Sequence, residues 1–206
     1  MPSHLMPWQG ALPTLDARMV HPAAVDAAPG APPGLLNGES VTTIGSTVTK
    51  RRSEDEVPLI TASPALAGAL QQVLVDLIEL QLQGKQAHWN VVGRNFRDLH
   101  LQLDDIVDTA REAADTVAER IRALGAAVDG RSDMVAAATT LPAFPGGEQD
   151  TATVASLLDT RLRATAATLR QARDEVDAED PPTADLLHAI IDDLEKHAWM
   201  MRAENR

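Results

Sequence analysis

Two histidines and three acidic residues in the middle of the chain are well suited to binding a metal ion. They are His88, His100, Asp104, Asp115 and Glu119, spaced 12, 4, 11 and 4 residues apart. Imidazole nitrogens and carboxylate oxygens together suit iron, manganese or zinc. The chain has no cysteine, which excludes thiolate-bound metals, iron–sulfur clusters and disulfides. This segment therefore predicts a metal centre built from nitrogen and oxygen ligands.

The residues around these candidate ligands repeat with the period of an α-helix. From Asn95 to Leu124, apolar residues recur at helical spacing, and Gly125 follows in the position of a helix C-cap. At roughly 100° per residue, the apolar residues form one narrow stripe. The four candidate ligands from His100 to Glu119 fall on a separate arc, centred about 140° from the stripe. They should therefore point away from the face that packs inside the chain.

Distance along the helix divides these four ligands into two pairs. His100 with Asp104 and Asp115 with Glu119 each span about one helical turn. Asp104 and Asp115 lie about 16 Å apart along the axis at 1.5 Å per residue, too far to bind one ion together. A second, antiparallel copy of the helix would bring the two pairs together, as in a two-fold homodimer. The pattern thus predicts metal sites that are shared between subunits.

An ordinary solvent-exposed helix face explains the same residues without a metal ion. Asp108 and Arg111 lie on the same arc, and Arg111 could form a surface ion pair with Asp115. Helix geometry alone leaves this interpretation open. The adjacent His88 and Trp89, at the end of the preceding helix, favour the metal centre because they add a further ligand at a fixed spacing.

Several segments resemble motifs of the Dps family, the ferritin-like proteins also called mini-ferritins. Residues 88–104, H-W-N-V-V-G-R-N-F-R-D-L-H-L-Q-L-D, resemble the first motif of this family. Residues 115–125, D-T-V-A-E-R-I-R-A-L-G, resemble the second. Short similar segments at residues 183–188 and 195–199 extend the resemblance to roughly residues 63–205. The resemblance implies an all-α, ferritin-like four-helix bundle.

The resemblance also implies a ferroxidase centre at a two-fold subunit interface. There Fe(II) would be oxidised by hydrogen peroxide or, more slowly, by dioxygen, and ferric mineral would be stored inside a hollow homododecamer. His88, His100 and Asp104 would come from one subunit, and Asp115 and Glu119 from its partner. Zinc or manganese could replace iron at such ligands as surrogates. No Glu in the chain has a His three residues later, which argues against the E-x-x-H sites of classical ferritins.

Four other residues gain candidate roles from the resemblance. Trp89 would lie beside the iron site, where an indole can intercept an oxidising radical, or would close the end of the bundle. Lys85, one turn before His88, would balance charge at the site or remain exposed. Asp180 and Asp185 would line an acidic pore for iron entry, or would cap the last helix and complement its dipole.

Apolar periodicity and capping residues predict the elements that position these side chains. The first helix should begin at Ser63 and Pro64, a cap followed by a proline at the first helical position. A short helix should occupy the long connection between the second and third long helices. The expected helices cover about residues 63–90, 95–124, 132–138, 151–178 and 180–206. No strand pattern appears in the sequence.

The first 62 residues differ in composition from the rest of the chain. They are rich in Pro, Gly and Ala, which predicts a disordered N-terminal tail and leaves residues 63–206 as the bundle domain. The tail does not resemble a secretory signal, and no 18 consecutive residues are apolar, so we expect a cytoplasmic protein without a membrane span. Its basic cluster, Lys50, Arg51 and Arg52, could touch a few DNA phosphates, although acidic residues follow at once.

The chain is acidic, with a net charge of −12. Such a protein attracts cations and repels nucleic acid at long range. The leading hypothesis is an iron-oxidising storage protein that protects against oxidative stress. One alternative is a nucleoid-associated protein that compacts DNA through its tail. A third is a structural bundle whose ligand-like residues bind nothing.

Overall fold

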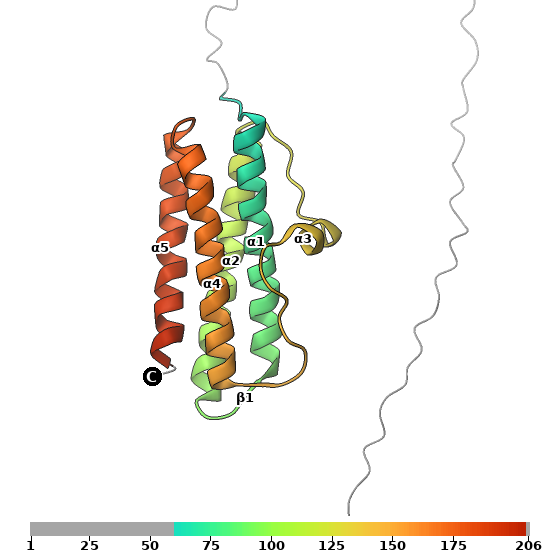
Figure 1. Ribbon diagram of the computed structural model, residues 1–206, viewed down its shortest axis with the longest axis vertical. Coiled ribbons are helices and arrows are strands. Elements are labelled where there is room, and N and C mark those ends of the chain that lie inside the picture. Colours follow the sequence, from blue (N-terminus) through green and yellow to red (C-terminus); the bar gives the residue numbers. More distant parts are fainter. Residues whose placement is uncertain (1–59, 205–206) are drawn as a thin grey trace, which may run out of the picture. The chain divides into compact units, whose positions relative to one another are not determined.

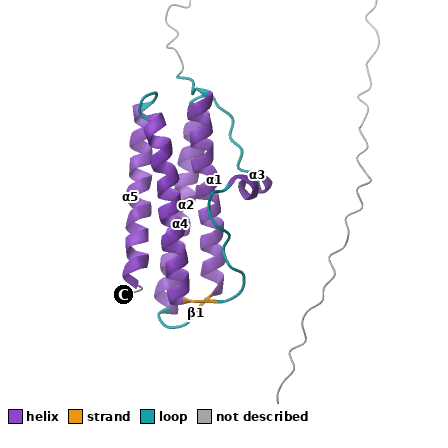
Figure 2. Cartoon of the chain, in the orientation of Figure 1, coloured by secondary structure: helices purple, strands orange, loops and turns teal. Residues whose placement is uncertain are grey.

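The computed structural model describes residues 60–204, which form a bundle of four long helices (Figure 1). These are α1 (Pro64–Asn90), α2 (Phe96–Ala123), α4 (Thr151–Val176) and α5 (Pro181–Glu204). A short helix, α3 (Ser132–Ala138), lies in the long connection from α2 to α4, beside α1 (Figure 2). The connection runs along the bundle, so α2 and α4 point in the same direction. The all-α four-helix bundle with its short connecting helix is confirmed.

Local sequence signals fix the ends of the helices. The Ser63 hydroxyl accepts a hydrogen bond from the backbone N–H of Leu66 at 3.1 Å, and Pro64 occupies the first helical position of α1. At the same end of the bundle, α2 ends at Ala123 because Gly125 adopts a φ of 77°. Both boundaries agree with the sequence prediction to within about two residues, the usual uncertainty of helix ends.

Two very short strands were not expected from the sequence. β1 (Val91–Val92) and β2 (Gln149–Asp150) pair in parallel and join the end of α1 to the start of α4. Segments of two residues are too short to show the alternation by which a strand is recognised in a sequence. The expectation of no strand was therefore wrong in this detail.

The core is aliphatic and includes the predicted stripe of α2. Leu103, Ile106 and Val117 are fully buried, and each large apolar side chain buried in this way contributes about 1.5–3 kcal/mol. The candidate ligands of α2 occupy the other side of the helix. They are half-buried near its N-terminal end and exposed further along. The predicted separation of the packing face from the ligand face is thus confirmed.

A glycine controls how closely α1 and α2 approach each other. A Cβ atom at Gly84 would lie only 2.7 Å from Cγ2 of Val107. Real Cβ atoms essentially never show such a contact, so any larger residue would push the two helices apart. Gly84 lies one turn before His88, and it therefore sets the helix spacing at the level of the candidate ligands.

A buried carboxylate fastens the long connection to the bundle. Asp76 of α1 accepts hydrogen bonds from the hydroxyls of Thr139, Thr140 and Thr168, at 3.1, 2.6 and 2.8 Å. The backbone N–H of Thr140 adds another at 2.8 Å. Because a buried carboxylate without partners is costly, this network holds the residues after α3 against α1 and α4.

Among the described residues, α1 is the one helix with the length and composition of a membrane-crossing segment. Many of its apolar side chains, including Leu66, Leu70 and Leu77, are buried in the bundle. A core helix of a bundle has the same composition, so this property does not distinguish the two. The predicted tail over residues 1–62 lies almost wholly outside the described residues, as do Lys50, Arg51 and Arg52.

Candidate metal centre

Three of the predicted ligands meet where the end of α1 faces the start of α2. His88, His100 and Asp104 each offer one ligand atom, and these atoms lie within 4.8 Å of one another. The two imidazole rings stack with their centroids 3.6 Å apart. Nδ1 of His88 lies 3.3 Å from Oδ1 of Asp104. In the described part of the chain, no other group of three histidine or acidic side chains has this geometry.

Backbone carbonyl groups orient both imidazoles. Nδ1 of His88 lies 3.0 Å from the carbonyl oxygen of His100, and Nδ1 of His100 lies 3.0 Å from the carbonyl oxygen of His88. A carbonyl oxygen can only accept, so each Nδ1 carries the proton and each Nε2 keeps a free lone pair. Metal-binding histidines are commonly oriented in this way. Both imidazoles are therefore held in the form that binds a metal ion.

Lys85 pairs with the carboxylate of the cluster. Its Nζ lies 2.5 Å from Oδ1 of Asp104. The hydrogen bond from Lys85 lowers the pKa of Asp104; burial opposes this, and the charge of the Lys85 ammonium adds to the lowering. Asp104 is thus kept ionised, and a metal ion must compete with the ammonium for this oxygen. This geometry agrees with the interpretation that Lys85 balances charge at the site.

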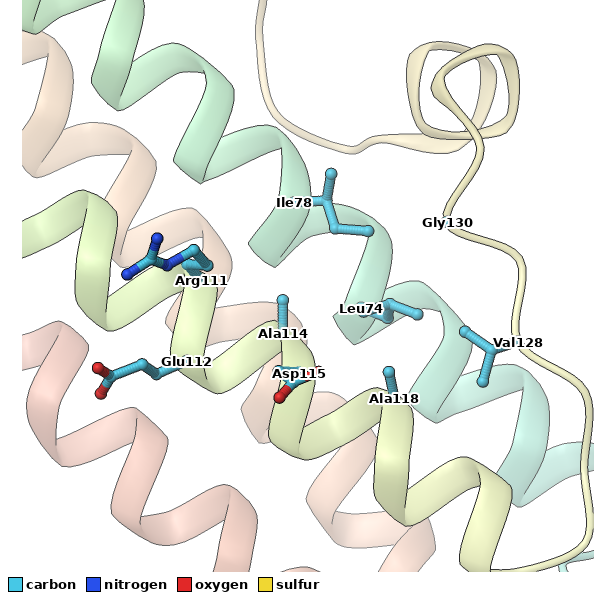
Figure 3. A pocket seen from close by; sticks show the side chains of 9 residues that line it. All are labelled: Leu74, Ile78, Arg111, Glu112, Ala114, Asp115, Ala118, Val128 and Gly130. Carbon is cyan, nitrogen blue, oxygen red and sulfur yellow. The ribbon is translucent and has the colours of Figure 1, made fainter.

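Asp115 and Glu119 do not join the cluster within one chain. Both are exposed and lie further along α2. Asp115 lines an open hollow of about 490 Å³ between α1, α2 and the following connection (Figure 3). The other walls are mostly apolar and include Leu74, Ile78, Ala114, Ala118 and Val128. In the single chain, these two carboxylates are therefore exposed and separate from the cluster.

Aromatic side chains next to the cluster are exposed. Trp89 is 71% exposed, so it does not close the end of the bundle within its own chain, and that interpretation was wrong. Its position directly after His88 leaves the role beside the metal centre open. Phe96 packs against the ring of His100 with a centroid separation of 5.1 Å. Sequence analysis missed Phe96, although its place four residues before His100 puts both on one helix face.

The two candidate pore residues have different environments. Asp180 is only 2% exposed and accepts hydrogen bonds from Arg120, at 2.6 Å, and from the hydroxyl of Thr183. Burial alone would raise the pKa of Asp180, but the bonds from Thr183 and Arg120 outweigh it and lower the pKa. Asp180 therefore joins α2 to α5, and a pore-lining role does not fit it. Asp185 is exposed, with His188 nearby.

Comparison with known proteins agrees with this geometry. A model of the ferritin-like domain matches residues 67–205. DNA protection during starvation protein 2 of Deinococcus radiodurans is 42% identical over 66% of this chain, but the match spans only 56% of that relative. DNA protection during starvation protein of Agrobacterium fabrum is 35% identical over 69% of this chain and 88% of its own length.

A solved structure is similar over the same region. Dps from Microbacterium arborescens in the high iron form has a TM-score of 0.63 and 35% identity, covering 70% of this chain and 97% of that one. The domain match runs through nearly all of the four long helices and contains the cluster of His88, His100 and Asp104. The chain therefore belongs to the Dps family of ferritin-like proteins.

Proposed function

We propose that this protein oxidises Fe(II) and stores the ferric product, and so protects the cell against peroxide. The observation that carries the proposal is the cluster of His88, His100 and Asp104, with both Nε2 atoms free and the carboxylate ionised. Membership of a ferritin-like family supports iron as the substrate. The Microbacterium relative was solved in a high iron form, which supports it further.

The two ligand types suit the two oxidation states of iron. The neutral imidazoles of His88 and His100 can bind Fe(II), and carboxylates stabilise the higher charge of Fe(III). Two Fe(II) ions at one centre supply the two electrons that, with two protons, reduce one hydrogen peroxide to two water molecules. A single iron would supply one electron and release a hydroxyl radical. Pairing the irons thus explains how oxidation could also protect.

A second subunit would complete each centre. One chain brings only three ligands together, and its Asp115 and Glu119 lie too far along α2 to reach them. In an antiparallel two-fold dimer, Asp115 and Glu119 of the partner subunit would face this cluster. Two such centres would form in each dimer. Zinc or manganese should occupy the same ligands as surrogates.

Family membership supports an assembly larger than the dimer and suggests further partners. We extend the dimer to a homododecamer with an interior for ferric mineral, in which Asp185 remains a candidate for the iron-entry pore. Cytoplasmic location, association with the nucleoid and DNA contact through Lys50, Arg51 and Arg52 stay predictions. DNA compaction as the main role also stays a prediction, because the residues that would carry it lie outside those described.

The catalytic assignment is tested by replacing His100 and Asp104 together with Ala. Peroxide-driven Fe(II) oxidation should fall to the background rate, and stoichiometric binding of Zn(II), which undergoes no redox change, should be lost. Asp105→Ala, an exposed neighbour on α2 outside the cluster, is the control and should change neither. Circular dichroism confirms that both variants are folded. Oxidation by the double variant at the wild-type rate would show that the assignment is wrong.

A further inference from the structure

The shared centre fixes which residues of α2 lie at the two-fold axis, so this inference rests on the proposed function. Asp104 must meet Asp115 of the partner subunit, and His100 must meet Glu119 of the partner subunit. Both pairs have the same midpoint, between residues 109 and 110. When two antiparallel helices are related by a two-fold axis, residues equally far from this midpoint lie level with each other.

Asp108 and Arg111 are the charged residues of the ligand face closest to this axis. They lie on either side of the midpoint, each about 2 Å from it along the helix at 1.5 Å per residue. Arg111 projects from α2 near Asp115, at the hollow in Figure 3. Asp108 of the partner subunit would lie level with Arg111, and Arg111 of the partner subunit level with Asp108. Opposite charges would therefore meet across the axis twice.

Within one chain, these two residues form only a weak ion pair. Nη2 of Arg111 lies 3.1 Å from Oδ1 of Asp108, and the two side chains are 62% and 59% exposed. Exposed pairs of this kind contribute little to stability, because water screens the charges and both side chains lose freedom. Both groups can thus change partners at little cost when a second copy approaches. A dimer interface would exclude water from the exchanged pairs and strengthen them.

We propose that Arg111 and Asp108 form two equivalent salt bridges with Asp108 and Arg111 of the partner subunit. These bridges set the register of α2 against its copy and so bring the two halves of each metal centre together. The neighbouring level pair, Asp104 with Asp115 of the partner subunit, is acidic on both sides, and before a metal ion binds only Lys85 offsets its charge. The central bridges are therefore an attraction available to the dimer before metal binding.

Charge reversal separates a bridge between subunits from the ion pair within a chain. A homodimer of Asp108→Arg has four positive groups at the axis, and a homodimer of Arg111→Asp has four negative groups. A mixed dimer of the two variants still has like charges within each chain. Across the axis, however, it has opposite charges at both positions. Only a bridge between subunits predicts that mixing the two variants restores subunit pairing and Zn(II) binding.

The experiment uses full-length chains with two different tags, refolded separately and together. Native mass spectrometry measures pairing, and calorimetric titration with Zn(II) measures the shared centre. Each single variant should lose at least about tenfold in association or Zn(II) affinity, a free-energy change of about 1.4 kcal/mol. The mixture should form mainly mixed pairs and recover near wild-type Zn(II) affinity. Asp105→Arg, an equal charge change on α2 off the ligand face, should have no such effect.

Two results would overturn the proposed bridges. The single variants could pair and bind Zn(II) like the wild type, or their mixture could recover neither property. A parallel mixture of His100→Ala, Asp104→Ala chains with Asp115→Ala, Glu119→Ala chains tests the shared centre by itself. If that mixture binds Zn(II) while charge reversal has no effect, only the bridges are wrong. If it does not, the shared centre and the bridges are both wrong.

Discussion

At the scale of single residues, the candidate centre combines fixed imidazoles with a carboxylate that a lysine already neutralises. His88 and His100 each donate a hydrogen bond from Nδ1 to the backbone carbonyl oxygen of the other, which fixes their rings before a metal arrives. Lys85 holds Asp104 in the ionised form. A metal ion thus meets ligands in the correct protonation state, but it must displace one ammonium group to use them fully.

Replacing Lys85 with Met should strengthen metal binding at neutral pH and make it more sensitive to acid. The competing ammonium is lost, so Zn(II) affinity at about pH 7 should rise. The pKa of Asp104 is below its unfolded value near 3.9, so its ion pair stabilises the fold above that pH. This contribution is lost as the pH falls through the folded pKa. Without Lys85, Asp104 protonates at a higher pH, and metal binding should decline earlier on acidification.

Calorimetric Zn(II) titrations between about pH 4 and 7 measure both effects. Lys196→Met, which removes an exposed lysine of α5 outside the cluster, is the matched control. If Lys85→Met left both the affinity and its pH profile unchanged, Lys85 would not compete for the site.

At the scale of elements, the centre depends on the spacing of α1 and α2, because each helix supplies part of it. Gly84 permits the close approach at this level. Asp76 and Asp180 fasten other parts of the bundle through buried hydrogen bonds, the first to the long connection and the second between α2 and α5. The sequence shows where helices begin and end, whereas these contacts exist only once the helices have packed.

Gly84→Ala should disturb the centre through the fold. The added methyl group would collide with Val107, and overpacking of this kind costs about 1–3 kcal/mol. Because the helices must separate one turn before His88, Zn(II) affinity should fall as well. Gly68→Ala on the same helix is the control. Its new Cβ has nothing within 4 Å, so it should instead stabilise the protein by about 0.5–1 kcal/mol. Urea unfolding measures the stability of both variants. Equal changes in stability for Gly84→Ala and Gly68→Ala would contradict the steric argument.

Asp180→Asn should destabilise the bundle by about 2 kcal/mol, because Arg120 loses its charged hydrogen-bond partner. The lowered pKa of Asp180 means that its contribution is complete above about pH 4 and is lost as the pH falls through the folded pKa. The difference between wild type and variant in unfolding free energy should therefore shrink in acid. Asp185→Asn, which alters an exposed side chain, should change stability by less than about 0.5 kcal/mol. If the difference in unfolding free energy between wild type and Asp180→Asn stayed constant as the pH fell below about 4, this would argue against the buried ion pair.

At the scale of the whole molecule, the described region exposes large apolar side chains that a monomer would normally bury. Phe96 contacts a histidine of the metal cluster, and Trp89 directly follows the other histidine. The exposed residues of this kind are Ile60, Leu82, Trp89, Val92, Phe96, Leu101 and Trp199. Such surfaces usually mark contacts between proteins. They agree with a bundle that functions as part of an assembly.

Light scattering of the purified protein should give a mass about twelve times that of the 22.0 kDa chain. Phe96→Glu, which places a charge among the exposed apolar side chains near the cluster, should lower this mass by weakening a subunit contact. Glu175→Gln, an exposed polar change on α4 rather than on the ligand-bearing helix, should leave it unchanged. A monomeric wild-type protein would contradict the assembly.

Sequence analysis predicted the features that depend on residues close together in the sequence or on the family motif. It missed those that depend on contacts between distant residues. The start of α1 was predictable because Ser63 and Pro64 act on adjacent residues. The pairing of His88 with His100 was predictable only through the family motif, because the two residues lie on different helices. Burial of Asp180 was not, because it depends on Arg120 from a helix about 60 residues away. The ammonium of Lys85 on Asp104 was left open for the same reason, since only packing brings the two helices together.

One mixing experiment tests the shared metal centre most directly. Chains carrying His100→Ala and Asp104→Ala are refolded with an equal amount of chains carrying Asp115→Ala and Glu119→Ala. Each variant alone should be inactive in peroxide-driven Fe(II) oxidation. With random pairing, half of the dimers are mixed and each has one intact centre, so about a quarter of wild-type activity should return. A mixture as inactive as its components, or a single variant that oxidises iron at the wild-type rate, would contradict the shared centre.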